Sequence, residues 1–144
     1  MGVHERRMAQ ARRAGVVLSD TLEIEPYPGD RLWMHGDISC RGGIVIRVSK
    51  HLQVLGGDGG DAMVETVRYN YNAAVRGHGT FLRHDNIHTH RGHRDAHHRH
   101  VGDWRTSEES RPEWVGEAGW PTLGQFIEMV DEWYWLNHHE LPEP

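Results

Sequence analysis

The sequence predicts an α+β domain in which an antiparallel β-meander sheet is packed by one C-terminal helix. Three observations support this prediction. Apolar and polar residues alternate along 44–55 and 64–73, which is typical of strands that face a core on one side. Turn signals rich in glycine or proline separate the predicted strands. Apolar residues then recur at helical spacing along 122–139, and an apolar sheet face needs such a covering element.

The chain of 144 residues fits one domain, and its net charge of −5 argues against general attraction to duplex DNA. We expect a mobile basic segment at 1–15, the sheet with a histidine-rich segment at 16–102, a polar connection at 103–121 and the helix at 122–139. Cys40 is the single cysteine, which excludes an internal disulfide and favours a reducing compartment. No apolar run has the length of a signal peptide or membrane span, so we expect a cytoplasmic protein without a membrane partner.

Five stretches are predicted to be strands, because they are rich in β-branched residues or alternate between apolar and polar residues. They are residues 16–24, 32–40, 44–55, 64–73 and 80–86. Turns are expected at 26–29, 56–60 and 77–79, where proline and glycine gather. Tyr69 and Tyr71 share one face of the fourth strand. The fifth strand leads directly into the segment that is rich in histidine.

The helix is expected to begin at Thr122, since Thr122 and Gln125 have the spacing of a capping box. Its apolar stripe is predicted to lie in the core and consists of Leu123, Phe126, Ile127, Val130, Trp133 and Tyr134. Trp104 and Trp114 are the expected anchors of the polar connection before it. The glutamates of this connection are Glu108, Glu109, Glu113 and Glu117. This acidic bias could fold the connection over the basic histidine segment.

Residues 83–100 hold seven of the chain's thirteen histidines, together with four arginines and two aspartates. Histidine changes its charge near pH 6.5, so a cluster of this kind can bind a metal, transfer protons or hold an anion. The fixed charge of the segment is positive, in contrast to the chain as a whole, and this favours an anionic ligand.

A metal site is one interpretation of this segment. Histidine nitrogens suit zinc, nickel or copper, and an aspartate could add an oxygen ligand. The candidate ligands are His88, His90, His98 and His100, with Asp85 or Asp95. The chain has no HExxH motif and no cysteine pair, and histidine-rich loops bind metals without using them. We therefore expect no cofactor, and a divalent metal such as zinc is the alternative.

Acid–base chemistry on an RNA phosphodiester is the second interpretation. Cleavage through the RNA's own 2′-hydroxyl needs a base, an acid and cations that hold the phosphate. Histidines can supply the first two, and arginines can clamp phosphate with paired hydrogen bonds. The arginines available are Arg83, Arg91, Arg94 and Arg99. Tyr69 and Tyr71, on a neighbouring strand, could stack on unpaired bases.

A third interpretation is structural, with the histidines in a solvated loop. For any single histidine, such as His78 or His93, this is the simplest explanation. It does not account for the density of histidine across 83–100 as a whole.

Five motifs follow one another in the second half of the chain. They are RYNYN at 68–72, FLRHDN at 81–86, the single His90, HHRHVG at 97–102 and PTLGQFIEMVDE at 121–132. Their order and spacing, over roughly residues 64–135, resemble the TumE family of small toxins from two-gene toxin–antitoxin modules. The departures from the family's pattern are His84, His88, Thr89 and Ala96. Because Thr89 stands at a histidine position, the first histidine pair in this chain could be His88 with His90.

The resemblance implies a growth-inhibiting toxin that cleaves RNA and is held in check by a DNA-binding antitoxin encoded beside it. The basic N-terminal segment and residues 103–119 are both candidate antitoxin contacts. A homo-oligomer is also compatible with the sequence. Two other functions stay open: a module that binds metal or nucleic acid without catalysis, and a toxin that modifies RNA or protein instead of cutting it.

Residue roles follow from the chemistry and the resemblance together. The base and acid are expected to be two of four histidines, which are His90, His97, His98 and His100. Asp85 is expected to orient one imidazole by accepting its ring proton. Arg83 and Arg99 would hold phosphate, and Asn86 would position the loop or the substrate.

Overall fold

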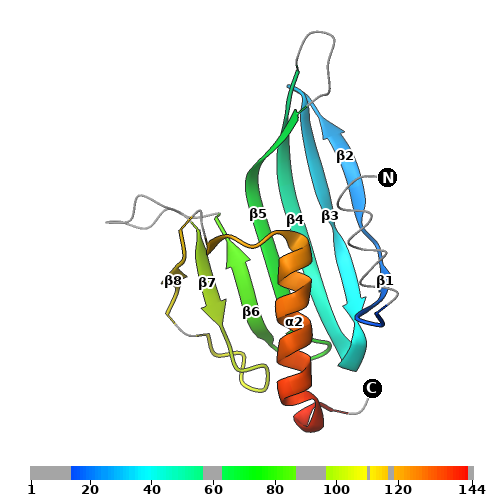
Figure 1. Ribbon diagram of the computed structural model, residues 1–144, viewed down its shortest axis with the longest axis vertical. Helices are drawn as coiled ribbons and strands as arrows, with labels where there is room; N and C mark the ends of the chain where they lie inside the picture. The colour runs from blue at the N-terminus through cyan, green and yellow to red at the C-terminus, as the bar shows by residue number, and fades with distance from the viewer. Residues whose placement is uncertain (1–13, 57–62, 87–96, 110, 117–118, 143–144) are drawn as a thin grey trace.

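The computed structural model describes residues 14–56, 63–86, 97–109, 111–116 and 119–142, and the structural statements below concern these residues. They form an antiparallel sheet of eight strands and one α-helix near the C-terminus (Figure 1). The predicted α+β class is therefore confirmed. Most of the predicted basic N-terminal segment and of the turn at 56–60 lies outside the described residues.

The strands follow one another as a meander for most of the sheet. Their bounds are β1 Val17–Asp20, β2 Glu23–Tyr27, β3 Arg31–Cys40, β4 Ile44–Leu55, β5 Met63–Val75, β6 Thr80–Asp85, β7 His98–Val101 and β8 Glu113–Trp114. The order across the sheet is β1-β3-β4-β5-β6-β7-β8, and β2 also pairs with β3. All pairs are antiparallel. The strands predicted at 32–40, 44–55, 64–73 and 80–86 correspond to β3, β4, β5 and β6.

The first part of the sheet differs from the prediction. The stretch 16–24 is not one strand, because the chain turns at Thr21 and Leu22, where the Leu22 amide donates to Asp20 Oδ1. The turn predicted at 26–29 is shifted, since Pro26 and Tyr27 belong to β2 and pair with β3. A proline fits there because β2 lies at the edge of the sheet, where one side of the strand needs no partner.

The helix α2, Leu123–Asn137, begins as predicted. Gln125 donates its backbone amide to the Thr122 hydroxyl, and its side-chain oxygen accepts from the Thr122 amide, which completes the capping box. A short 3₁₀ turn, η3 at His138–Glu140, follows α2. No helix among the described residues is both long and apolar enough to cross a membrane.

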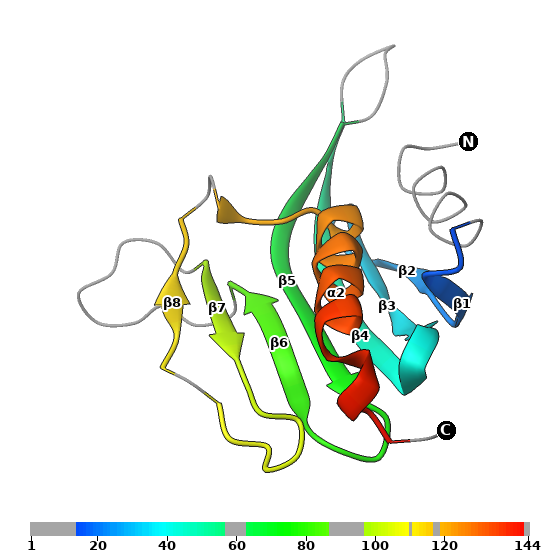
Figure 2. The ribbon, with the colours of Figure 1, turned by 60° about the horizontal axis from the view of Figure 1, so that its bottom comes forward.

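The core lies between α2 and one face of the sheet, with the helix in front of the central strands (Figure 2). Four residues of the predicted stripe, Leu123, Phe126, Ile127 and Val130, are buried, and Trp133 and Tyr134 pack against them. Trp133 stacks on Phe81 of β6 with ring centroids 3.7 Å apart. Trp104 is buried as expected of an anchor.

The two faces of the sheet have different chemistry. Tyr71 and His84 are opposite each other in the β5–β6 register and lie beneath Phe126, on what we call the helix face. The neighbouring pair, Asn72 and Arg83, points the other way. We call this opposite side, from Trp33 of β3 through Asn72 and Arg83 to His100 of β7, the open face. No helix among the described residues covers it.

Candidate functional site

The pairing of β6 with β7 joins two motifs that are separated in the chain. Arg83 is opposite His100 and Asp85 is opposite His98 in the antiparallel register. Opposite residues of paired strands point to the same face, so these four side chains meet on the open face. The strand β7 was not predicted, because its alternating residues are histidine and arginine and not apolar and polar.

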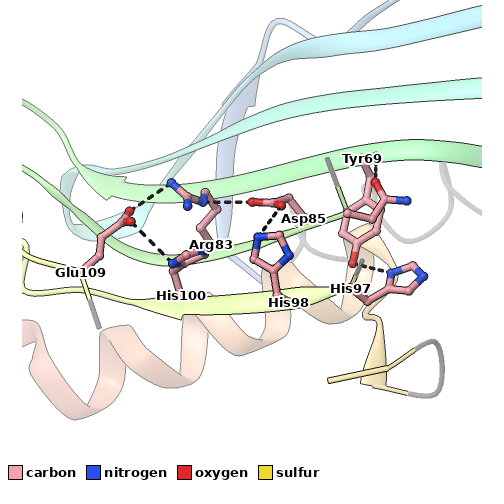
Figure 3. Close-up of polar contacts among 8 residues, drawn as sticks. Tyr69, Arg83, Asp85, His97, His98, His100 and Glu109 are labelled. Atoms are coloured by element: carbon pink, nitrogen blue, oxygen red, sulfur yellow. Dashed lines mark hydrogen bonds and ion pairs between the residues drawn. The ribbon is translucent and has the colours of Figure 1, made fainter. Parts of the chain in front are cut away.

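Asp85 is the centre of this group (Figure 3). Its Oδ1 lies 2.8 Å from His98 Nε2, and its Oδ2 lies 3.1 Å from Arg83 Nε. Asp85 and His98 are 3% and 1% exposed. A carboxylate in this position holds the proton of His98 on Nε2 and fixes the plane of the ring, and the Arg83 guanidinium balances the buried negative charge.

Glu109 closes the other end of the group. Its Oε1 lies 3.2 Å from Arg83 Nη1, and its Oε2 lies 3.7 Å from His100 Nδ1 (Figure 3). Glu113 pairs with Arg99 in the same way. The polar connection therefore pairs with the described ends of the basic segment, at Arg83 and Arg99. Sequence reasoning did not single out Glu109 as a site residue, because four similar glutamates stand in this connection and only the fold selects among them.

His100 is the more accessible of the two histidines that lie beside Asp85 and Arg83. Its side chain is 12% exposed, and its ring centroid lies 5.0 Å from that of His98. Partial burial lowers the pKa of His100, and Arg83 lowers it further, while Glu109 opposes this effect. The imidazole of His100 is thus kept neutral near pH 7, which is the state a general base requires.

Four other predicted site residues lie on the helix face, away from Asp85 and Arg83. They are Arg99, His97, Tyr69 and Tyr71. Arg99 alternates with His98 and His100 along β7 and pairs with Glu113. The ring of His97 stacks with Tyr69 and Trp120, and its Nδ1 lies 3.0 Å from the Tyr69 hydroxyl. The structure therefore does not bring Arg99 or His97 together with Arg83 and Asp85.

The predicted role of Tyr69 and Tyr71 as a base-stacking platform is wrong. Both side chains are 0% exposed, because the face of β5 that carries them is covered by α2 and Trp120. Tyrosines on a strand suit a core and a nucleic-acid surface equally well, and only the position of the helix decides between the two. Their rings stabilise the fold beneath the site.

Asn86 bonds to β5 in the structure, and its expected role in positioning the loop or the substrate stays a prediction. Its Oδ1 accepts from the Tyr69 amide at 2.8 Å, and its Nδ2 donates to the Val67 carbonyl at 3.1 Å. The side chain thus continues the β5–β6 ladder by one step beyond Asp85. These two bonds fix the position of Asn86 at the end of β6.

The remaining predicted residues of the histidine segment lie outside the described residues. They are His88, Thr89, His90, Arg91, His93, Arg94, Asp95 and Ala96. The expected roles of His90 as an acid or base and of His88 as a metal ligand therefore stay predictions.

Three side chains of the site could also hold a metal ion. Asp85, His98 and His100 each offer one ligand atom, and these atoms lie within 4.8 Å of one another. Two imidazoles and a carboxylate form a donor set that suits zinc or another divalent transition metal. The Arg83 guanidinium beside Asp85 opposes this use, because it places a fixed positive charge next to the metal position.

No model of a known protein family, no curated protein and no solved structure matches this chain.

Proposed function

We propose that this protein is the growth-inhibiting toxin of a two-gene toxin–antitoxin module and that it cleaves RNA by metal-independent acid–base chemistry. The observation that carries the proposal is the arrangement around Asp85. Its carboxylate holds His98 through one oxygen and Arg83 through the other, and His100 lies next to both. This group provides two imidazoles and a guanidinium on one face, which are the elements that phosphodiester cleavage requires.

The reaction uses the RNA's own 2′-hydroxyl as the nucleophile. Neutral His100 takes the proton of this hydroxyl, and the oxygen forms a bond to the adjacent phosphorus. The bond from phosphorus to the 5′-oxygen of the next nucleotide breaks, and His98 gives that oxygen a proton from its Nδ1. Asp85 keeps Nε2–H of His98 in place throughout. The products are a 2′,3′-cyclic phosphate and a 5′-hydroxyl.

Arg83 is the group that would hold the scissile phosphate. In the free protein its Nη1 is paired with Glu109, which also faces His100. A phosphate is an anion that suits the same two partners, so substrate would displace the Glu109 carboxylate from Arg83 and His100. The polar connection then opens at the position where the reaction takes place.

The toxin assignment rests on the order of the motifs and on where they lie. The RHDN and HHRH motifs, which are separated in the chain, lie on the paired strands β6 and β7. Together they supply what we call the Asp85 group, which consists of Arg83, Asp85, His98 and His100. Motifs that define one compact site support a shared function. A DNA-binding antitoxin would neutralise the toxin, and its gene is expected beside this one.

The experiment is cleavage of total RNA by the purified protein at pH 6 to 8 in excess chelator, with analysis of the product ends. We expect 2′,3′-cyclic phosphate ends. The His100→Ala substitution should lower the cleavage rate roughly 10²- to 10⁴-fold, the usual contribution of a general base. His139→Ala is the matched control, because His139 is exposed in η3, and it should cleave normally. Intact RNA after incubation with the unaltered protein would contradict the proposal.

A metal-dependent nuclease is the second candidate, and the Asp85, His98 and His100 cluster favours it. The same assay separates the two candidates. Cleavage that stops with chelator and returns with one added divalent metal would replace the metal-independent mechanism with this one.

A further inference from the structure

We infer that the substrate is single-stranded RNA and that it lies in a trough across the open face, between β3 and the Asp85 group. The inference takes the identity of the ligand from the proposed function and adds the binding site. In this inference the bases contact residues of the trough and not the buried Tyr69 and Tyr71.

The trough consists of two adjoining hollows in the open face. The larger hollow has a volume of about 680 Å³ and extends from Trp33 and His35 on β3 to Arg83 on β6. The smaller hollow has a volume of about 280 Å³ and reaches the turn at Gly77 and His78. They share three lining residues, which are Asp37, Arg47 and Asn72.

The charge of the trough is opposite to that of the whole chain. Its lining residues include three arginines, Arg47, Arg76 and Arg83, and a single carboxylate, Asp37. Arg47 is 79% exposed, and its ion pair with Asp37 is long at 3.7 Å, so its guanidinium is available to a phosphate. A local excess of arginine on a protein of net charge −5 favours an anion that follows the trough.

Aromatic rings lie at the end of the trough that is far from the catalytic group. Trp33 stacks on His35 with ring centroids 3.7 Å apart, and His51 lies nearly parallel to Trp33 at 5.9 Å. Trp33 is held in place by a 3.0 Å hydrogen bond from its Nε1 to Ser49 Oγ. An unpaired base can extend this fixed row of rings, and base stacking of this kind tolerates any sequence.

The middle of the trough has groups that can read the edges of bases. Asn70 and Asn72 lie between the rings and Arg83, and their amides can both donate and accept hydrogen bonds. In the register, Asn72 is opposite Arg83 and Asn70 is opposite Asp85. A strand of RNA that follows the trough therefore reaches the proposed catalytic group without leaving the open face. Paired bases would present neither free edges nor free faces to these residues, which favours a single strand over a duplex.

The test is the affinity of a fluorescent single-stranded RNA of about 12 nucleotides, measured by anisotropy in the His100→Ala background to suppress cleavage. Trp33→Ala should weaken binding roughly tenfold, and Trp33→Phe should restore part of the loss. Arg47→Gln changes an exposed residue and leaves the fold intact. It should reduce the slope of log affinity against log salt by about 0.7, the value for one phosphate contact.

Two control substitutions lie away from the open face. Trp135→Ala removes a tryptophan that is 55% exposed on α2, and Arg105→Gln removes an arginine paired with Glu140. Both should leave the affinity unchanged. Equal affinity of the Trp33, Arg47 and control variants would overturn the inference, as would equally tight binding of duplex RNA. If binding depends on Trp33 but the unaltered protein does not cleave, the trough stands and the proposed function fails. If the unaltered protein cleaves RNA but binding does not depend on Trp33 or Arg47, the proposed function stands and the trough fails.

Discussion

Asp85 Oδ1 and His98 Nε2 are 2.8 Å apart in a part of the sheet where both side chains are almost completely buried. A buried carboxylate is strongly unfavourable unless it is paired, and here an imidazole and the guanidinium of Arg83 share it. The contact therefore links the stability of the β6–β7 pair to the orientation of the His98 ring, which is the proposed acid.

The Asp85→Asn substitution should reduce both the free energy of unfolding and the rate of RNA cleavage. An amide has one accepting oxygen in place of two and carries no negative charge, so Arg83 loses its buried charged partner and His98 loses the group that fixes its tautomer. We expect the free energy of unfolding to fall by about 3 kcal/mol in urea titrations and the cleavage rate to fall at least 10²-fold where the variant is still folded. Glu140→Gln, which removes an exposed ion pair with Arg105, should change the free energy of unfolding by less than about 1 kcal/mol. Equal changes in the free energy of unfolding for the two substitutions would show that the buried Asp85 contact stabilises the fold no more than an exposed ion pair does.

Glu109→Gln tests whether this carboxylate occupies the place of the phosphate. The substitution removes the anion that competes with substrate for Arg83 and His100, so RNA should bind roughly two- to fivefold more tightly, in proportion to an exposed ion pair of up to about 1 kcal/mol. Glu109 also opposes the lowering of the pKa of His100. Without it that pKa falls further, and the acidic limb of the pH–rate profile should move to lower pH. Glu108→Gln is the control, since Glu108 is an exposed neighbour, and weaker RNA binding by Glu109→Gln would contradict the idea.

The sequence was sufficient for those elements in which one physical signal dominates. The bounds of β4 match the prediction at both ends, because the buried residues Ile44, Ile46 and Val48 alternate with less buried positions and the sequence is rich in glycine before and after the strand. The start of α2 follows from the capping box of Thr122 and Gln125. By contrast β7 and β8 are short and lack an apolar alternation, and they become strands because β7 pairs with the edge of β6 and β8 pairs with the edge of β7.

The candidate site was predicted less well than the fold, for a reason that β7 illustrates. Residues 97–100 are neighbours in the chain, yet His98 and His100 lie on the open face whereas Arg99 lies on the helix face. Composition identified the segment but could not assign its members to faces, because no apolar residue marks the register. The open-face residues Trp33 and Arg47 lie on strands that were predicted, and their place in the proposed trough becomes visible only once the order β3-β4-β5-β6 is known.

Tyr69 and Tyr71 are both buried, so the effect of removing a tyrosine hydroxyl can be compared at two neighbouring positions. Tyr69→Phe removes a hydroxyl that is 3.0 Å from His97 Nδ1 and should lower the free energy of unfolding by about 1 kcal/mol. Tyr71→Phe removes a buried hydroxyl with no hydrogen-bond partner among the described residues, and should leave stability unchanged or raise it. Urea unfolding of both variants measures the difference. Neither should weaken single-stranded RNA binding, and a large loss of binding with intact stability would restore the tyrosines as a binding surface.

His84 makes the stability of the protein depend on pH. It is 2% exposed beneath Phe126, and neither ring nitrogen has a hydrogen-bond partner among the described residues. Burial lowers its pKa to about 4, with a further contribution from Arg99. The unfolded chain, in which histidine titrates near 6.5, therefore binds this proton first as the pH falls. The loss of stability that His84 causes is therefore absent above about pH 6.5, and it grows progressively as the pH falls from there to pH 4.

The His84→Leu substitution isolates this effect. Between pH 7 and pH 5 the free energy of unfolding should fall by about 2 kcal/mol less in the variant than in the unaltered protein, because leucine takes up no proton in either state. At pH 7 the variant should be at least as stable, since it no longer buries two unpaired nitrogens. His139→Ala, at an exposed position in η3, should keep the pH dependence of the unaltered protein. Urea titrations at the two pH values give all three results, and parallel pH profiles for His84→Leu and the unaltered protein would show that His84 is not the group that titrates.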